Sequence, residues 1–172
     1  LELIRGYCFA ACSGLYGELR LPEKLKHMGR SAFSFCPGLT GSLTIPQGLS
    51  TIPVEAFSDS GFNGTLTLHD GITNISLLAF NNCHFKGELR LPKNLRTISE
   101  RAFTNNDFSG ELKLPPSVEH IGSYAFTNNW RITGILSIPD GVVSIGQEAF
   151  AGCKMLEGVV FPESMETIRQ RA

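Results

Sequence analysis

The chain has 172 residues, of which 42% are hydrophobic and 18% are charged, and its formal net charge is −1. This composition excludes intrinsic disorder, and the lack of a basic excess argues against nucleic acid as a partner. No apolar run reaches the about 18 residues of a membrane-spanning helix, so we expect no membrane-spanning segment in this chain. Phenylalanine is unusually frequent, with 12 residues against one tryptophan and three tyrosines.

An internal repeat of 23 or 24 residues covers the whole chain. An Ala-Phe pair recurs with this period from Ala32-Phe33 to Ala149-Phe150, and columns of glycine and proline keep the same phase. Units of this kind have an apolar side that only a stacked neighbour can bury, so they form a solenoid. We predict one solenoid, interpreted as an excerpt of a longer array, with partial repeat 1–16, full repeats 17–40, 41–63, 64–86, 87–109, 110–133 and 134–157, and partial repeat 158–172.

Each repeat begins with a predicted short strand. In Gly87-Glu-Leu89-Arg-Leu91-Pro92 two leucines alternate with polar residues, and the proline ends the strand because it lacks an N–H. The equivalents predict one parallel strand per repeat at Leu19/Leu21, Leu43/Ile45, Leu66/Leu68, Leu89/Leu91, Leu112/Leu114, Leu136/Ile138 and Val159/Phe161. The following stretch, as in Val118-Glu-His-Ile121, fits a second short extended segment or a loose turn better than a long helix.

The Ala-Phe pair comes next, and it predicts a tight turn or a single helical turn in which alanine fits where chains crowd. The predicted fold class is therefore an α/β repeat made mostly of short β-strands. We predict that a first phenylalanine column forms a stacked spine, that a second column takes three more rings, and that Phe161 lies on the last strand. These core positions account for eleven of the twelve phenylalanines: Phe9, Phe33, Phe57, Phe80, Phe103, Phe126, Phe150, Phe62, Phe85, Phe108 and Phe161.

A column of small residues follows each Ala-Phe pair, and it predicts a buried turn whose side chains bond to neighbouring backbone groups. Its members are Cys12, Cys36, Ser60, Cys83, Asn106, Asn129 and Cys153. Cys12 and Cys36 would lie about 5 Å apart, inside the disulfide range, but adjacent turns point their Cβ atoms the same way, so a bridge stays open. Five cysteines at wide spacing do not match a disulfide framework or a zinc site, and we expect no metal and no cofactor.

The sequence contains no phosphate-binding glycine loop, Gly-x-Ser-x-Gly elbow or His-Glu-x-x-His motif, so we expect no enzyme and no catalytic residues. The outward strand positions predict a mixed-charge, threonine-lined ligand face. Like charges would stack on neighbouring strands and opposite charges would lie diagonally, and simple solvation of this face is the alternative. A second candidate is a set of aromatic residues outside the core, because tryptophan and arginine are enriched at binding hot spots. The candidate ligand-binding residues are Arg20, Thr44, Thr67, Glu88, Arg90, Glu111, Lys113, Tyr124, Trp130 and Arg131.

The repeated pattern also resembles a known family. Leu-x-[Leu/Ile]-Pro-x-x-[Leu/Val]-x-x-Ile-x-x-x-Ala-Phe-x-x-[Cys/Asn], seen from Leu136 to Cys153, is similar to the BspA-like (Treponema-type) bacterial leucine-rich repeat. The resemblance implies a right-handed leucine-rich-repeat solenoid with its strands on the concave side. It also implies a secreted or cell-surface location, a role in adhesion, and a host extracellular or matrix protein as partner. The expected function is a non-enzymatic surface-displayed binding module, and the alternative is a structural spacer of a larger cell-surface protein.

Overall fold

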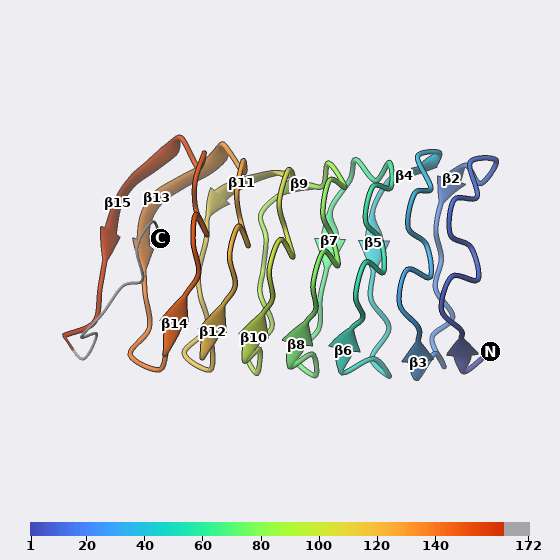
Figure 1. The fold of residues 1–172 in the computed structure, drawn as a ribbon, viewed down its shortest axis with the longest axis horizontal. Helices are drawn as coiled ribbons and strands as arrows, with labels where there is room; N and C mark the ends of the chain where they lie inside the picture. Colours follow the sequence, from blue (N-terminus) through green and yellow to red (C-terminus); the bar gives the residue numbers. More distant parts are fainter. Residues whose placement is uncertain (164–172) are drawn as a thin grey trace.

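Short parallel strands stack in register along one axis, from the N-terminal turn to the last one (Figure 1). The structure is a computed structural model in which residues 1–163 are described, so most of the predicted partial repeat 158–172 lies outside the described residues. Every strand pair is parallel, and partners lie 21 to 24 residues apart in the sequence. The predicted solenoid of about seven turns is confirmed.

The first group of strands contains the isoleucine that lies before the Ala-Phe segment of most repeats, with Met28 in its place in β3. The isoleucines are buried and their preceding residues face outward, which is the alternation of a half-buried strand. These strands form a pair, β1–β3, and a five-stranded sheet in the order β14-β12-β10-β8-β6. Their bounds are β1 Leu3–Ile4, β3 His27–Met28, β6 Thr51–Ile52, β8 Asn74–Ile75, β10 Thr97–Ile98, β12 His120–Ile121 and β14 Ser144–Ile145.

The second group lies on the return path of each turn, around the glycine column. It comprises the pairs β2–β4 and β5–β7 and a four-stranded sheet in the order β15-β13-β11-β9. Gly110 and its equivalents Gly17, Gly41, Gly87 and Gly134 adopt a positive φ where the chain turns into the return path, a conformation that glycine adopts without a Cβ penalty. The bounds are β2 Gly17–Glu18, β4 Leu39–Thr40, β5 Leu43–Thr44, β7 Leu66–Thr67, β9 Lys86–Gly87, β11 Asp107–Glu111, β13 Arg131–Ser137 and β15 Met155–Val160.

Two details of the predicted fold class are corrected by these strands. Residues 1–163 contain no helix, so the fold is an all-β solenoid in the described part rather than an α/β repeat. Most turns contribute two strands rather than one, because the segment predicted as extended or loosely turned is itself a strand. A two-residue strand carries too little alternation to be distinguished from a turn by sequence pattern alone.

The Ala-Phe segment is a pair of tight turns, not a helical turn. The Ala102 N–H donates to Ser99 O at 3.2 Å across Arg101, whose φ is +53°. The Asn129 N–H donates to Phe126 O at 3.3 Å across Asn128, whose φ is +62°. Positive φ at the third residue is the geometry of a type II turn, and it reverses the chain within four residues. The backbone of this segment also donates hydrogen bonds to the next turn, as from the Phe103 N–H to Ala125 O. The two backbones therefore lie close together, and the alanines from Ala32 to Ala149 are fully buried between them.

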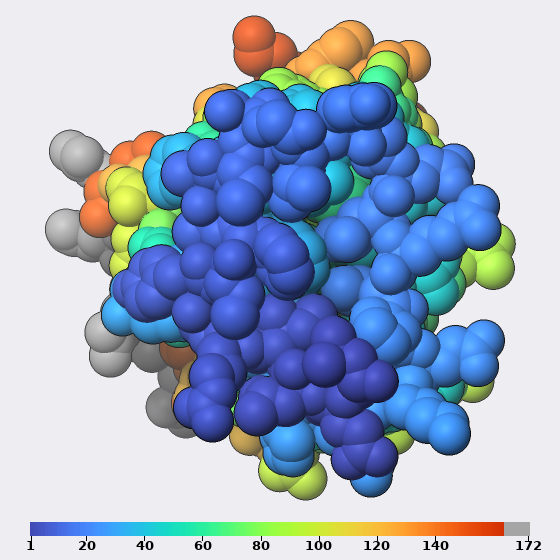
Figure 2. Space-filling model, turned by 90° about the vertical axis from the view of Figure 1, so that its right-hand side faces the viewer, coloured from blue at the N-terminus to red at the C-terminus, as the bar shows by residue number. Residues whose placement is uncertain are grey.

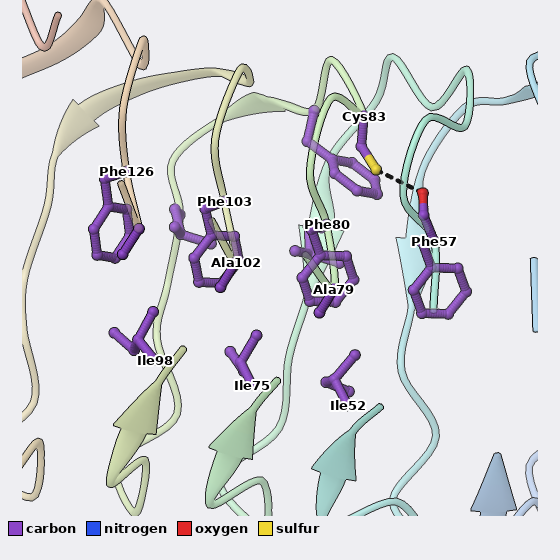
Figure 3. Close-up of a cluster of buried hydrophobic side chains, with 14 of the residues drawn as sticks. Ile52, Phe57, Ile75, Ala79, Phe80, Cys83, Ile98, Ala102, Phe103 and Phe126 are labelled. Carbon is purple, nitrogen blue, oxygen red and sulfur yellow. Dashed lines mark hydrogen bonds between the residues drawn. The ribbon is translucent and has the colours of Figure 1, made fainter. Parts of the chain in front are cut away.

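Phenylalanine rings form the predicted spine through the core (Figure 3). Stacked rings along the spine lie 5.1 to 5.9 Å apart between centroids. The second column packs edge-on against it, as in Phe103 and Phe108, whose centroids are 6.0 Å apart. Offset stacking and edge contacts are the favoured arrangements of aromatic pairs, so the spine stabilises the stacking of the turns as well as filling the core.

Two phenylalanines assigned to the core are instead partly exposed at the ends of the described stack. Phe9 is 39% exposed because the first turn has a neighbour on one side only, and Phe161 is 46% exposed. The pairing of β13 with β15 shifts register between Gly134 and Ile135, and β15 ends at Val160. After this shift Val159 pairs with buried Leu136, as the predicted equivalence of the two strands requires, and its exposure reflects its place in the last described turn.

The buried column of small residues is confirmed, and its hydrogen bonds explain its composition. From Cys36 onward, each side chain of the column donates to the carbonyl of a spine phenylalanine in the preceding turn. Cys83 Sγ donates to Phe57 O at 2.9 Å (Figure 3), and Ser60 Oγ donates to Phe33 O at 2.7 Å. Asn106 Nδ2 donates to Phe80 O at 2.8 Å. A thiol, a hydroxyl and an amide can all make this bond, so the column requires a small donor and not a particular residue. All five thiols are free in the structure.

Candidate functional site

The return strands place seven of the ten candidate residues on one outward face. Alternation buries Leu89 and Leu112 and turns their neighbours Arg90 and Lys113 outward. Arg90 and Lys113 are partners in a parallel bridge, so their side chains stand on adjacent turns. We call this surface the strand face, and its candidate members are all exposed: Arg20, Thr44, Thr67, Glu88, Arg90, Glu111 and Lys113.

Charges on the strand face pair along each strand, not diagonally between strands. The Arg90 guanidinium lies 3.1 Å from the Glu88 carboxylate, and the Lys113 ammonium lies 3.5 Å from the Glu111 carboxylate. Like charges therefore stand side by side on neighbouring turns, as predicted, whereas the expected diagonal pairing is not found. Exposed pairs of this kind contribute about 0–1 kcal/mol each, so they can be exchanged for contacts with a partner at little cost in stability.

One apolar residue on the strand face was not among the predicted site residues. Ile135 is 63% exposed and lies in a shallow hollow lined by Glu111, Lys113, Leu114 and Ser137. Its partner in the next turn is Gly158, which has no side chain to cover it. Its outward position follows from strand alternation, but its exposure depends on the register of β13 against β15, which the sequence pattern does not define.

The three remaining candidates lie elsewhere. Tyr124 is half-buried in the Ala-Phe segment, and the Arg101 guanidinium carbon lies 4.8 Å from its ring centroid. Trp130 and Arg131 lie after the buried column, where the Arg131 guanidinium carbon is 5.1 Å from the tryptophan ring centroid. The ten candidates therefore occupy three separate regions, and the structure does not gather them into one site.

A further apolar hollow lies at the N-terminal end of the described stack. Figure 2 looks along the solenoid onto the first turn, with the later turns behind it. An apolar hollow lined by Leu1, Phe9, Leu15, Tyr16 and Leu19 opens at this end. It is the exposed end of the phenylalanine spine, so its apolar character follows from the core.

Within residues 1–163, burial and backbone hydrogen bonds are the main causes of the shifted pKa values. Burial raises the pKa of the Cys36 and Cys83 thiols, and it raises that of Cys153 to about 11. The backbone N–H of Lys93, which donates to Asp70, lowers the pKa of that exposed carboxyl. Within residues 1–163 no three His, Cys, Asp or Glu side chains are grouped as metal ligands, and no helix has the length and hydropathy to cross a membrane.

Stacked turns with an aliphatic and aromatic core, a fixed repeat length and a buried small-residue column define a leucine-rich-repeat solenoid. The chain belongs to the BspA-type leucine-rich repeat family, because the model described as "BspA type Leucine rich repeat region (6 copies)" matches residues 1–107 and 73–172. The predicted family is thereby confirmed. No curated protein matches the chain. A leucine-rich cell surface protein from Faecalibacterium prausnitzii A2-165 is a similar solved structure, with 20% identity and a TM-score of 0.31 over 96% of this chain and 74% of that one.

Proposed function

We propose that this solenoid is a non-enzymatic protein-binding module of a surface-displayed protein, and that it binds through the strand face around Ile135. The observation that carries the proposal is an exposed aliphatic residue in a hollow flanked by the Glu111–Lys113 pair. Protein interfaces combine an apolar centre with a polar rim that excludes water from it. The strand face offers both elements on one continuous surface.

The rim of this surface favours a protein over a nucleic acid or a small molecule. Glu88 and Glu111 alternate with Arg90 and Lys113, so neither sign of charge dominates as a polyanion-binding surface would require. The hollow is shallow and open, unlike the enclosed pockets that bury most of a small ligand. Family membership supports display at the cell surface and adhesion to a host extracellular or matrix protein as the role of this surface.

The experiment measures binding of the purified chain to immobilised fibronectin, fibrinogen, laminin and collagen by biolayer interferometry. We expect saturable binding to one of them and at least a roughly tenfold loss of affinity in Ile135→Arg, because a charge would replace the apolar centre. Val143→Arg is the matched control, since Val143 is 73% exposed and lies beside β14, outside the strand face.

Equal losses in the two variants, or saturable binding that neither affects, would contradict the strand face as the binding surface. Absence of saturable binding to the whole panel would instead favour the alternative, a structural spacer. For the spacer, the continuous core and inter-turn hydrogen bonds would be sufficient by themselves. Circular dichroism on both variants checks that they remain folded.

A further inference from the structure

Two exposed columns run along the solenoid on either side of the buried small-residue column. One contains the positive-φ residue just before each buried residue: Phe35, Asp59, Asn82, Asn105, Asn128 and Gly152. The other contains the residue just after it: Pro37, Gly61, His84, Asp107, Trp130 and Lys154. Both columns follow the edge along which β4, β9 and β11 begin (Figure 1). We call the surface between them the edge groove.

Hollows in the edge groove occur at two places, and each is lined by both columns. One is formed by Pro37, Asp59, Gly61, Asn82 and His84, with buried Ser60 at its floor. The other is formed by Asn128, Trp130, Gly152 and Lys154. Gly152 keeps this second hollow open, because a Cβ there would collide with the Asn128 amide oxygen. The same surface is therefore hollowed near both ends.

Amide groups line the first column in register with the turns. Asn82 Nδ2 donates to Asp59 Oδ1 at 2.9 Å, and Asn128 Nδ2 donates to Asn105 Oδ1 at 2.8 Å. These bonds fix the side chains in a row. Within the described residues they leave the amide oxygens of Asn82 and Asn128 and the amide nitrogen of Asn105 without a side-chain or backbone partner. A row of fixed donors and acceptors with unused capacity matches the hydroxyl groups of a sugar.

Exposed aromatic rings stand at the two ends of this amide row. Phe35 is 57% exposed with a φ of +55°, although this conformation favours asparagine and is unusual for a bulky residue. Trp130 is 46% exposed beside Asn128. Neither position requires an aromatic residue for packing, since the other turns have Ala, Asp, Asn or Gly at the first and Ser, Pro, Gly, His, Asp or Lys at the second. Flat rings of this kind pack against the apolar faces of sugar rings.

The turn that carries Trp130 also departs from its neighbours beneath the surface. Asn106 Oδ1 accepts a hydrogen bond from the Phe85 N–H at 3.1 Å. Asn129 Oδ1 is fully buried and has no partner among the described residues. An unsatisfied buried acceptor costs about 1–3 kcal/mol. Asn129 immediately precedes Trp130 in the chain, so this unsatisfied acceptor lies next to the groove.

We propose that the edge groove binds an extended β-1,4-linked glycan chain that lies along the solenoid axis. Adjacent turns are about 4.8 Å apart, so an extended chain that lies along the axis would pass the amides of successive turns. Phe35 and Asn128 are separated by four turns, which places the two aromatic ends about 19 Å apart. The groove carries only Asp59, Asp107 and Lys154 as charged residues besides His84, which suits a neutral chain better than a polyanion.

The test measures binding of N-acetylchitohexaose, cellohexaose and the corresponding trisaccharides to the purified chain. Binding is measured by isothermal titration calorimetry and by the fluorescence emission of Trp130, the only tryptophan in the chain. We expect one hexasaccharide to bind saturably and to change the emission of Trp130. Phe35→Asn should lower affinity for the hexasaccharide roughly tenfold, the loss of one aromatic contact, and should leave the weaker trisaccharide binding at the tryptophan end unchanged.

Tyr7→Asn is the matched control, since Tyr7 is 56% exposed with a φ of +60° but lies outside the groove. Both substitutions place asparagine at a positive φ that it tolerates, so both variants should fold. The proposal is overturned if neither hexasaccharide binds saturably, if Tyr7→Asn weakens binding as much as Phe35→Asn, or if Phe35→Asn instead abolishes binding to a matrix protein. Ile135→Arg should leave sugar binding unchanged, which separates this site from the strand face.

Discussion

Removal of one ring from the middle of the phenylalanine spine is the sharpest perturbation of this fold. Phe103 is fully buried, stacks on Phe80 at 5.5 Å and on Phe126 at 5.4 Å, and meets the edge of Phe108 at 6.0 Å. Phe→Ala in a core costs about 3–5 kcal/mol through lost burial and the remaining cavity. The three aromatic pairs, each contributing about 0.5–1.5 kcal/mol beyond burial, place Phe103→Ala near the upper end of that range.

Two control substitutions separate burial in the spine from the general effect of mutation. Thr67→Ala on the strand face should change the free energy of unfolding by less than about 0.5 kcal/mol. Phe9→Ala, which loses a single stack at 5.1 Å and a partly exposed ring, should cost about 1–2 kcal/mol. The expected order of destabilisation is therefore Phe103→Ala, then Phe9→Ala, then Thr67→Ala.

Urea unfolding followed by circular dichroism and by Trp130 emission measures these differences. Coincident transitions justify a single free energy, whereas separate transitions would show that the turns on the two sides of the lost ring unfold independently. Either observation is compatible with a spine that couples neighbouring turns. Equal losses for Phe103→Ala and Thr67→Ala would refute the assignment of inward and outward faces.

Three further predictions test the buried column and the strand face. Asn106→Ala should cost about 2–3 kcal/mol in urea unfolding, because it leaves Phe80 O and the Phe85 N–H without partners, whereas Asn106→Cys should cost less than half as much since a thiol keeps the donor. The thiol of an unfolded cysteine ionises near about pH 8.5, whereas burial raises the pKa of Cys153 in the folded chain to about 11. The free energy of unfolding should therefore fall as pH rises between these two values. A Cys153→Ser variant should show a shallower fall when the free energy of unfolding is measured from about pH 8 to 11. An unchanged pH dependence would argue against burial of this thiol. Arg90→Glu should shift the free energy of unfolding by less than about 1 kcal/mol, because its pair with Glu88 is exposed; a larger shift in a thermal melt would show that the strand face is structural.

Features that recur in every turn were predictable from the sequence because each column meets the same environment repeatedly. The phenylalanine spine and the buried donor column are examples, since stacked turns place equivalent residues against one another. The isoleucine strands, such as β6, β8, β10 and β12, were harder to predict from the sequence. Their hydrogen-bond partners lie about one repeat away, and two residues of alternation do not define a strand. A signal for the tight turns was present in Asp59, Asn82, Asn105 and Asn128, which belong to the few residue types that favour positive φ.

The candidate sites were predictable only in part, because exposure depends on pairing register as well as on alternation. The sequence pattern placed Arg90 and Lys113 outward, and they are exposed. It did not single out Ile135, whose exposure follows from the register shift after Gly134 and from Gly158 opposite it. Tyr124 and Trp130 were grouped as aromatic residues outside the core, yet the two lie in different segments of the turn.

Positions that break the rule of their own column are the most informative about function in such a solenoid. Stability determines what a column can contain: aromatic rings in the spine, small donors beneath the edge groove, and residues tolerant of positive φ beside them. Phe35 violates the last of these preferences, and Ile135 violates the polar pattern of the strand face. Each departure costs stability or solubility without an evident structural gain, which is the reason for placing the two proposed sites at these positions. The two departures lie on different surfaces, the strand face and the edge groove, so the two proposed sites can be tested independently of each other.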